Sequence, residues 1–278
     1  MIKKILVCIE GSPSGERAVE TAIQLARQLG AGLTGLAIVD EPDIRAGAAT
    51  SIGGGAYKRQ RDDALLEDAQ KQSTEWLVKF IERCREEGIV AQPLTERGRP
   101  AATILEEMKS YDLTLMGRHA NFTFETAAQD RQTRDAVLHN ARSPVMVIPE
   151  NARLDAHKIL MAFDGSSASK RAVKTFAESG LATGSEIHVA SADDDGTVAW
   201  EMATRAVDML REYELRAQQH SIVSTLPIAE AVLQLRERLG AGLIVMGAYT
   251  RSRLSELIWG SVTRALIAGT PVPLYLHH

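Results

Sequence analysis

The chain of 278 residues has no excess of basic residues, only two cysteines and few aromatic residues. Its net charge of −4 excludes a general nucleic-acid binder, because affinity for a phosphate backbone requires a basic face. Cys8 and Cys84 have no partner at metal-ligand or redox spacing, which favours a reducing cytoplasm over export. The first apolar run reaches Glu10 too soon for a signal peptide or a membrane span, so we expect no membrane partner.

Several motifs of common enzymes and metal proteins are also absent. The chain has no P-loop and no serine in G-x-S-x-G, which removes support for a P-loop NTPase and for a nucleophile elbow. Residues 30–35 fit G-x-G-x-x-G, but they follow a predicted helix and lead into a strand, so we interpret them as a helix C-cap and turn. The seven histidines form no ligand pattern, and we expect the terminal pair, His277 and His278, to be exposed and no metal to be bound.

What the chain does contain is an internal repeat. Residues 4–12, KILVCIEGS, are matched by residues 158–166, KILMAFDGS. Three further pairs of segments match in the same order: 17–19 with 171–173, 113–117 with 243–247, and 143–145 with 270–272. The chain is therefore predicted to be two copies of one domain, residues 1–150 and 157–278, joined near residues 151–156.

Each copy alternates short apolar runs with segments of helical periodicity, which predicts βαβ units and a parallel sheet covered on both faces. The fold class is thus α/β, with two tandem doubly wound domains, each a five-stranded mostly parallel sheet. The predicted strands are 3–9, 33–39, 89–94, 112–116 and 144–148, then 158–163, 186–190, 220–225, 242–246 and 272–276. Right-handed crossovers bring the loops after the first and fourth strands together at the carboxyl edge, where open α/β sheets bind ligands.

The first copy also carries an insertion between Asp40 and Arg61 with four glycines. We expect a surface loop there. The alternative is a flap that closes over a ligand or a neighbouring subunit.

One segment of the second copy, residues 243–266, has the pattern of a phosphate cradle. An apolar strand stops at Gly247, and Gly260-Ser261 then opens an apolar helical segment. Glycine allows close approach of the main chain to a ligand, and the N–H groups of a first helical turn attract anions. The alternative is that Gly247 only ends a strand and Gly260 only begins a helix.

Taken together, the tandem doubly wound copies, the Asp-Gly-Ser after a first strand and the glycine loop after the fourth resemble the universal stress protein family in its tandem-domain form. The resemblance covers nearly the whole chain, apart from the insertion and the linker. It implies a regulatory protein of the stress response that binds ATP, with or without Mg²⁺. The second copy matches the family's Gly-x-x-Gly-x9-Gly-Ser/Thr loop except at Thr250, which stands where the family has its second glycine.

The resemblance and the chemistry of the side chains assign roles in the second copy. Asp164 is expected to accept hydrogen bonds from the adenosine end, although it could instead cap the helix that follows. Gly247 and Gly260 are expected to present N–H groups to the phosphates, with Ser261 adding its hydroxyl. The apolar neighbours of the sugar and base are predicted to be Met246 and Val262. Arg251 and Arg253 either offset phosphate charge or are simply solvated.

The first copy departs from this pattern. Gly117 is present, but Ala120 stands at the second glycine and Asp130-Arg131 replace Gly-Ser. Glu10 replaces the aspartate. An acidic residue where a phosphate would lie adds like-charge repulsion, so we expect no ATP in this copy.

Three functions are compatible with these residues. The first is a nucleotide-binding regulator whose ATP biases its conformation or its choice of an unknown protein partner. The second is a scaffold that has lost nucleotide binding, for which Thr250 is the best argument. The third is a slow ATPase, which we expect least because no catalytic base or Walker-type lysine stands near the loop, so no catalytic residue is assigned.

The last strand of each copy is expected to lie at a sheet edge. In the family such edges pair subunits, so we expect an internal pseudo-dimer in which the two last strands pair, and we allow a further homodimer of chains. Pro273 removes one hydrogen-bond donor from its strand, which fits only if that position faces away from the partner strand.

Overall fold

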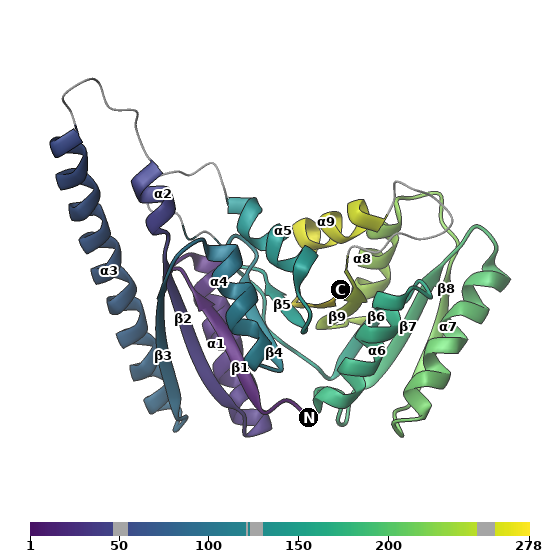
Figure 1. The fold of residues 1–278 in the computed structure, drawn as a ribbon. Helices are drawn as coiled ribbons and strands as arrows, with labels where there is room; N and C mark the ends of the chain where they lie inside the picture. The colour runs from purple at the N-terminus through teal and green to yellow at the C-terminus, as the bar shows by residue number, and fades with distance from the viewer. Residues whose placement is uncertain (47–54, 121, 123–129, 249–258) are drawn as a thin grey trace.

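Ten strands form one sheet in the computed structural model of the protein, which describes all residues except 47–54, 121, 123–129 and 249–258 (Figure 1). The strand order is β3-β2-β1-β4-β5-β10-β9-β6-β7-β8, so each half contributes five neighbouring strands. The two halves repeat the same order outward from the centre. The fold class expected from the sequence is confirmed, because each half is an α/β unit with a parallel sheet.

The elements of the first half follow the predicted alternation, with additional helical segments. They are β1 (Lys4–Ile9), α1 (Pro13–Leu29), β2 (Gly32–Val39), α2 (Glu41–Ala46), α3 (Gly55–Glu86), β3 (Ala91–Arg97), α4 (Pro100–Glu107), η1 (Met108–Ser110), β4 (Leu113–Gly117), α5 (Asp130–Asn140) and β5 (Val145–Ile148). Gly30 is the C-cap of α1 in the left-handed region, at φ 64°, which confirms that residues 30–35 are a helix end and turn.

The second half has a simpler series of elements. They are β6 (Lys158–Ala162), α6 (Ser167–Ser179), β7 (Glu186–Ala192), α7 (Gly196–Arg211), β8 (Ala217–Ile222), α8 (Ile228–Leu239), β9 (Leu243–Gly247), α9 (Trp259–Gly269) and β10 (Leu274–His277). The outer strand β8 begins three residues before its predicted start. Its sequence, AQQHSI, is polar and half exposed, so it lacks the apolar run by which the other strands are recognised.

The two halves join through their last strands. β10 pairs with β5 in the antiparallel direction, with Tyr275 opposite Met146. The expected pairing of the last strands is thus confirmed, and both strands lie at the centre of the sheet. Pro273 precedes β10, and its carbonyl oxygen accepts a hydrogen bond from Ile244 N of β9 at 3.1 Å. The hydrogen-bonding side of Pro273 therefore faces β9, so its missing N–H removes no hydrogen bond between β10 and β5.

Two apolar clusters lie on opposite faces of the sheet and extend across both halves. One is formed with α1, α3, α6 and α7, and the other with α4, α5, α8 and α9. Tyr275 is buried in the first of these, against the ring of Phe176. Because each face is covered by helices from both halves, the chain packs as a continuous three-layer structure.

The insertion differs from the expected loop. Its two ends are helical, as α2 and as the start of α3, whose first turns extend beyond the strands in Figure 1. Residues 47–54 between them lie outside the described part of the chain. The reason for the helices is tertiary: Ile44 is fully buried with Val39, Leu66 and Ala69 in a small third cluster. The expectation of a loop over 40–61 was therefore wrong for its helical ends.

His277 also differs from expectation. It belongs to β10 and is buried, with Nε2 3.1 Å from the carbonyl oxygen of Arg142 in the first half and Nδ1 3.1 Å from Thr175 Oγ1. The terminal histidine pair is therefore not a free tail. Within the described ranges, none of the helices combines the length and apolarity needed to cross a membrane.

Candidate functional site

The candidate site lies where β6 and β9 end side by side at the carboxyl edge of the second half. Ala162 of β6 is in register with Met246 of β9, so the turn after β6 and the end of β9 are neighbours. This arrangement follows from the strand order, because the first and fourth strands of each half are adjacent. It is the place at which doubly wound sheets accommodate ligands.

Asp164 and Ser166 shape the turn that leads from β6 into α6. Asp164 Oδ1 accepts the N–H of Ser166 at 3.0 Å, and Gly165 between them has a φ of 73°. Ser166 is the N-cap of α6, since its Oγ accepts the N–H of Ser169 at 3.1 Å. Asp164 therefore stabilises the turn that precedes the helix, while the cap itself is Ser166. The side chain of Asp164 is half-buried, and its bond to Ser166 N is made by Oδ1.

Gly247 is needed for packing. A Cβ at this position would lie 2.4 Å from Ser169 N and 2.7 Å from the carbonyl carbon of Ala168. The end of β9 thus touches the first turn of α6. Gly117 in the first half contacts α1 in the same way, with Ser14 Oγ at 2.5 Å from such a Cβ. Since both halves require this glycine, Gly247 alone does not distinguish a ligand cradle from close helix packing.

Gly260 is different, because no atom of the residues that the structure describes lies within 4 Å of a Cβ built on it. It is the second residue of α9, and Ser261 beside it is exposed. The side chains of Val262 and Thr263 are buried, with 5% and 1% of their surfaces exposed. In the first turn of α9, Gly260 therefore has no close neighbour among the described residues, and Val262 packs into the core.

The remaining predicted site residues divide into two groups. Met246 and Val262 belong to the same apolar cluster, and their side chains form part of the core beneath the carboxyl edge. Thr250, Arg251 and Arg253 lie outside the described residues. Among the residues that the structure does describe, no three His, Cys, Asp or Glu side chains are grouped so that they could hold a metal ion.

The corresponding edge of the first half is filled by the protein's own groups. Glu10 is buried, and its carboxylate accepts the N–H of Ser12 at 3.0 Å and the hydroxyl of Ser12 at 2.8 Å. Ser14 Oγ accepts the N–H of His119, at 3.1 Å, from the segment that follows β4. In the second half Ala168 stands at the position of Ser14 and has no hydroxyl.

Trp76 is part of this edge and was not expected from the sequence. Its indole covers Gly11 at the end of β1, with Cζ2 2.4 Å from where a Cβ of Gly11 would be. The sequence signal is a tryptophan in a long, largely polar helix, which does not show where the ring packs.

Arg118 connects this edge to the second half. Its guanidinium donates to the carbonyl oxygen of Thr270, just after α9. Burial, and then the nearby Arg134, lower the pKa of Arg118.

Cys8 lies in β1, just before Glu10. Burial and then Glu10 raise the pKa of the Cys8 thiol, which leaves that thiol unreactive.

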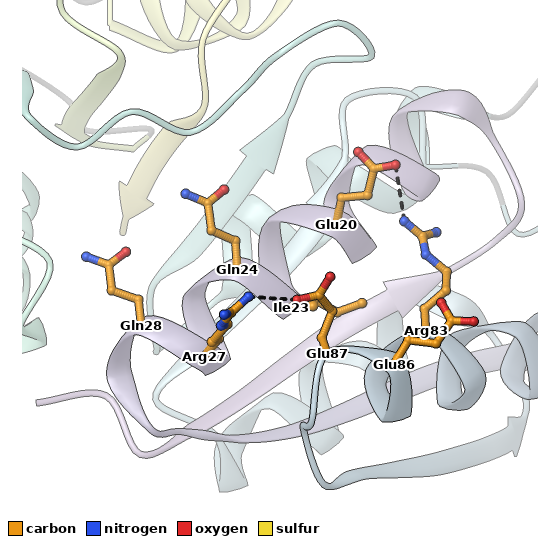
Figure 2. Close-up of a pocket in the computed structure, with 8 residues that line it drawn as sticks. All are labelled: Glu20, Ile23, Gln24, Arg27, Gln28, Arg83, Glu86 and Glu87. Carbon is orange, nitrogen blue, oxygen red and sulfur yellow. Dashed lines mark hydrogen bonds and ion pairs between the residues drawn. The ribbon is translucent and has the colours of Figure 1, made fainter.

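A cavity of about 660 Å³ lies elsewhere, between α1 and α3 (Figure 2). Four of the charged side chains that line it are paired: Arg27 with Glu87 at 2.9 Å, and Arg83 with Glu20 at 3.1 Å. It lies toward the carboxyl ends of both helices, away from the carboxyl edge of the sheet. A groove in which most of the charged groups pair with one another is a weak candidate for a ligand site, so the carboxyl edge of the second half is the better one.

The sequence profile of the universal stress protein family matches residues 1–149 and 156–278. A universal stress protein of Synechocystis sp. is 21% identical over 287 residues, covering 98% of this chain and 99% of that protein. The universal stress protein YxiE of Bacillus subtilis is 27% identical over 117 residues, which is 42% of this chain and 77% of that protein.

Solved structures show the same fold. The crystal structure of a universal stress protein from Archaeoglobus fulgidus has a TM-score of 0.71 at 20% identity, covering 99% of this chain and 95% of that one. A structure described as a putative universal stress protein from Pseudomonas aeruginosa has a TM-score of 0.56 at 17% identity, covering 99% and 93%.

Proposed function

The chain belongs to the universal stress protein family, and we propose that it is a regulatory protein of the stress response that binds an adenine nucleotide at the carboxyl edge of its second half. The observation that carries this proposal is the open first turn of α9. Among the described residues no neighbour requires a glycine at position 260, whereas Ser169 and Ala168 require one at position 247. A glycine in the first turn of a helix allows a phosphate to approach the N–H groups closely, and α9 follows β9, whose end lies beside that of β6.

In the proposed site, the carboxylate and the helix N-terminus bind different parts of the nucleotide. The carboxylate of Asp164 accepts hydrogen bonds and repels phosphate, so it suits the ribose hydroxyls or the adenine amino group. The N–H groups in the first turn of α9 favour the phosphates through the helix dipole, and the exposed hydroxyl of Ser261 can donate to them. We propose ATP, with or without Mg²⁺, as the nucleotide.

The first half is proposed to bind no nucleotide. The carboxylate of Glu10 already accepts two hydrogen bonds from Ser12, and the N–H of His119 is already bonded to Ser14. A ligand would compete with the hydroxyl of Ser12 for Glu10, and it would have to displace the indole of Trp76 from Gly11. We therefore propose one adenine nucleotide for each chain.

Two other functions make different predictions. A scaffold that acts only through protein contacts would be purified without nucleotide and would not bind added ATP. A slow ATPase would release phosphate under excess Mg-ATP. We propose the regulator over both because the second half retains Asp164, Gly247, Gly260 and Ser261 in register, while no group with the role of a catalytic base has been identified.

The test is titration calorimetry with ATP, with and without Mg²⁺, on the parent and on Gly260→Asp. The substitution places a carboxylate in the first turn of α9, where no described residue would be displaced, so binding should be lost while the melting temperature stays near that of the parent. Asp130→Asn in the first half is the matched control and should bind like the parent. Two equivalent sites in the parent, or unchanged binding by Gly260→Asp, would contradict the proposed site.

A further inference from the structure

Trp76 and Met202 occupy equivalent positions in the two halves. Each lies fifteen residues before the start of the third strand of its half, Ala91 in β3 or Ala217 in β8. The buried residues that follow them keep the same register. Leu77, Phe80 and Cys84 in α3 correspond to Ala203, Ala206 and Leu210 in α7. All six are in the same apolar cluster, so the equivalence is structural as well as numerical.

Both side chains face the glycine at the end of the first strand of their half, but at different distances. The Trp76 ring atoms Cζ2 and Cε2 lie 2.4 and 2.5 Å from where a Cβ of Gly11 would be. The Met202 atoms Cγ and Sδ lie 3.8 Å from the same point of Gly165. The indole therefore rests directly on the main chain of the turn, while the thioether stands back from it by an ordinary contact distance.

The difference matters because these glycines follow the acidic residue of each turn, Glu10 in the first half and Asp164 in the second. A rigid indole in contact with Gly11 would compete with a planar ligand ring for the space beside Glu10. Methionine is unbranched and flexible and can move aside for a ligand. Met202 is half-buried, so it has one face toward solvent at this edge.

We propose that this helix position is a gate for the adenosine end of the nucleotide: Trp76 closes the first half, and Met202 leaves the second half open. The inference rests on the proposed function and extends it by naming the side chain that decides which half is occupied. The gate acts on the base and ribose, at the opposite end of the nucleotide from the phosphate groups near Gly260.

The experiment uses the full chain with Met202→Trp, Met202→Phe and Met202→Leu, each titrated with ATP and with adenosine. Leucine conserves volume and should bind like the parent. Phenylalanine should weaken binding of both ligands, and tryptophan should weaken it at least about tenfold, equivalent to about 1.4 kcal/mol. Circular dichroism melting checks that each variant is folded, and the phenylalanine variant provides the test if the tryptophan variant does not fold.

The outcomes separate the inference from the proposed function. If the parent binds ATP and the folded tryptophan or phenylalanine variant binds it equally well, the gate is overturned while the nucleotide site stands. Weaker ATP binding with unchanged adenosine binding would also overturn it, because the effect would then concern the phosphates. If the parent binds neither ligand, the proposed function fails, and the inference fails with it.

Discussion

Nδ1 of His188 lies 3.0 Å from Nε2 of His220, so two histidines on neighbouring strands β7 and β8 share a hydrogen bond. His188 is buried, and its Nε2 is 3.1 Å from Glu186 Oε1, an ion-pair distance without the alignment of a hydrogen bond. One ring nitrogen of the pair must donate and the other must accept. Protonation of both rings would therefore break the bond and add repulsion.

This pair predicts a loss of stability in mild acid. Burial, then His188 and Arg238, lower the pKa of His220 in the folded protein. Below the unfolded value of about 6.5 the unfolded chain binds more protons, so the free energy of unfolding should fall as the pH drops from about 7 toward 5. Burial lowers the pKa of His277 too, so it contributes in the same direction.

Urea unfolding at several pH values between 5 and 7.5 measures this effect in the parent and in His220→Gln. The variant should lose less stability across that range, because glutamine can bond to His188 without titrating. His139→Gln is the control, since that histidine is exposed on α5. An identical pH dependence in the parent and His220→Gln would show that the histidine pair is not responsible.

The two glycines of the candidate loop should respond differently to alanine. Gly247→Ala forces a Cβ against main-chain atoms of Ser169 and Ala168, which cannot rotate away, so it should cost about 1–3 kcal/mol or more in the free energy of unfolding. Gly260→Ala meets no described neighbour within a helix and should leave stability unchanged or raise it by up to about 1 kcal/mol. Chemical denaturation compares them, and equal effects would mean that the end of β9 can move away from α6.

Tyr275 should contribute strongly to the stability of the junction. Its ring packs edge-on against Phe176, with centroids 5.3 Å apart, and its hydroxyl donates to Thr175 Oγ1 at 3.3 Å. Tyr275→Ala should cost about 3–5 kcal/mol by opening a cavity. Tyr275→Phe removes only the hydroxyl and should cost about 0.5–1.5 kcal/mol. Denaturant unfolding tests the difference, and a small effect of the alanine variant would show that the junction repacks.

Thr250→Gly tests the one departure from the family's loop. If this position requires a positive φ, threonine is strained there by about 1–3 kcal/mol. The glycine variant should then bind ATP more tightly, by about tenfold for each 1.4 kcal/mol relieved. Calorimetry measures the change. Unchanged affinity would place the position at negative φ, and an absence of nucleotide in both proteins would favour the scaffold function.

The sequence by itself determined the repeat, the alternation of strands and helices and the location of the glycine loop. These features depend on local periodicity and on residue types that act within a few positions, such as Gly30 at the end of α1. The resemblance to the family added the pairing of the last strands, which the antiparallel contact of Tyr275 with Met146 confirms. The sequence of a short apolar strand does not by itself specify the strand with which it pairs.

Only the tertiary structure decided which side chains occupy the carboxyl edges. Trp76 and Gly11 are far apart in the chain, and their contact depends on how α3 crosses the sheet. The helix at 41–46 forms where glycine-rich composition predicts a loop, because Ile44 finds a buried partner in Leu66. His277 is buried because β10 lies between β5 and β9 at the centre of the sheet. Such contacts join distant segments, so their energy does not appear in any local pattern of residues.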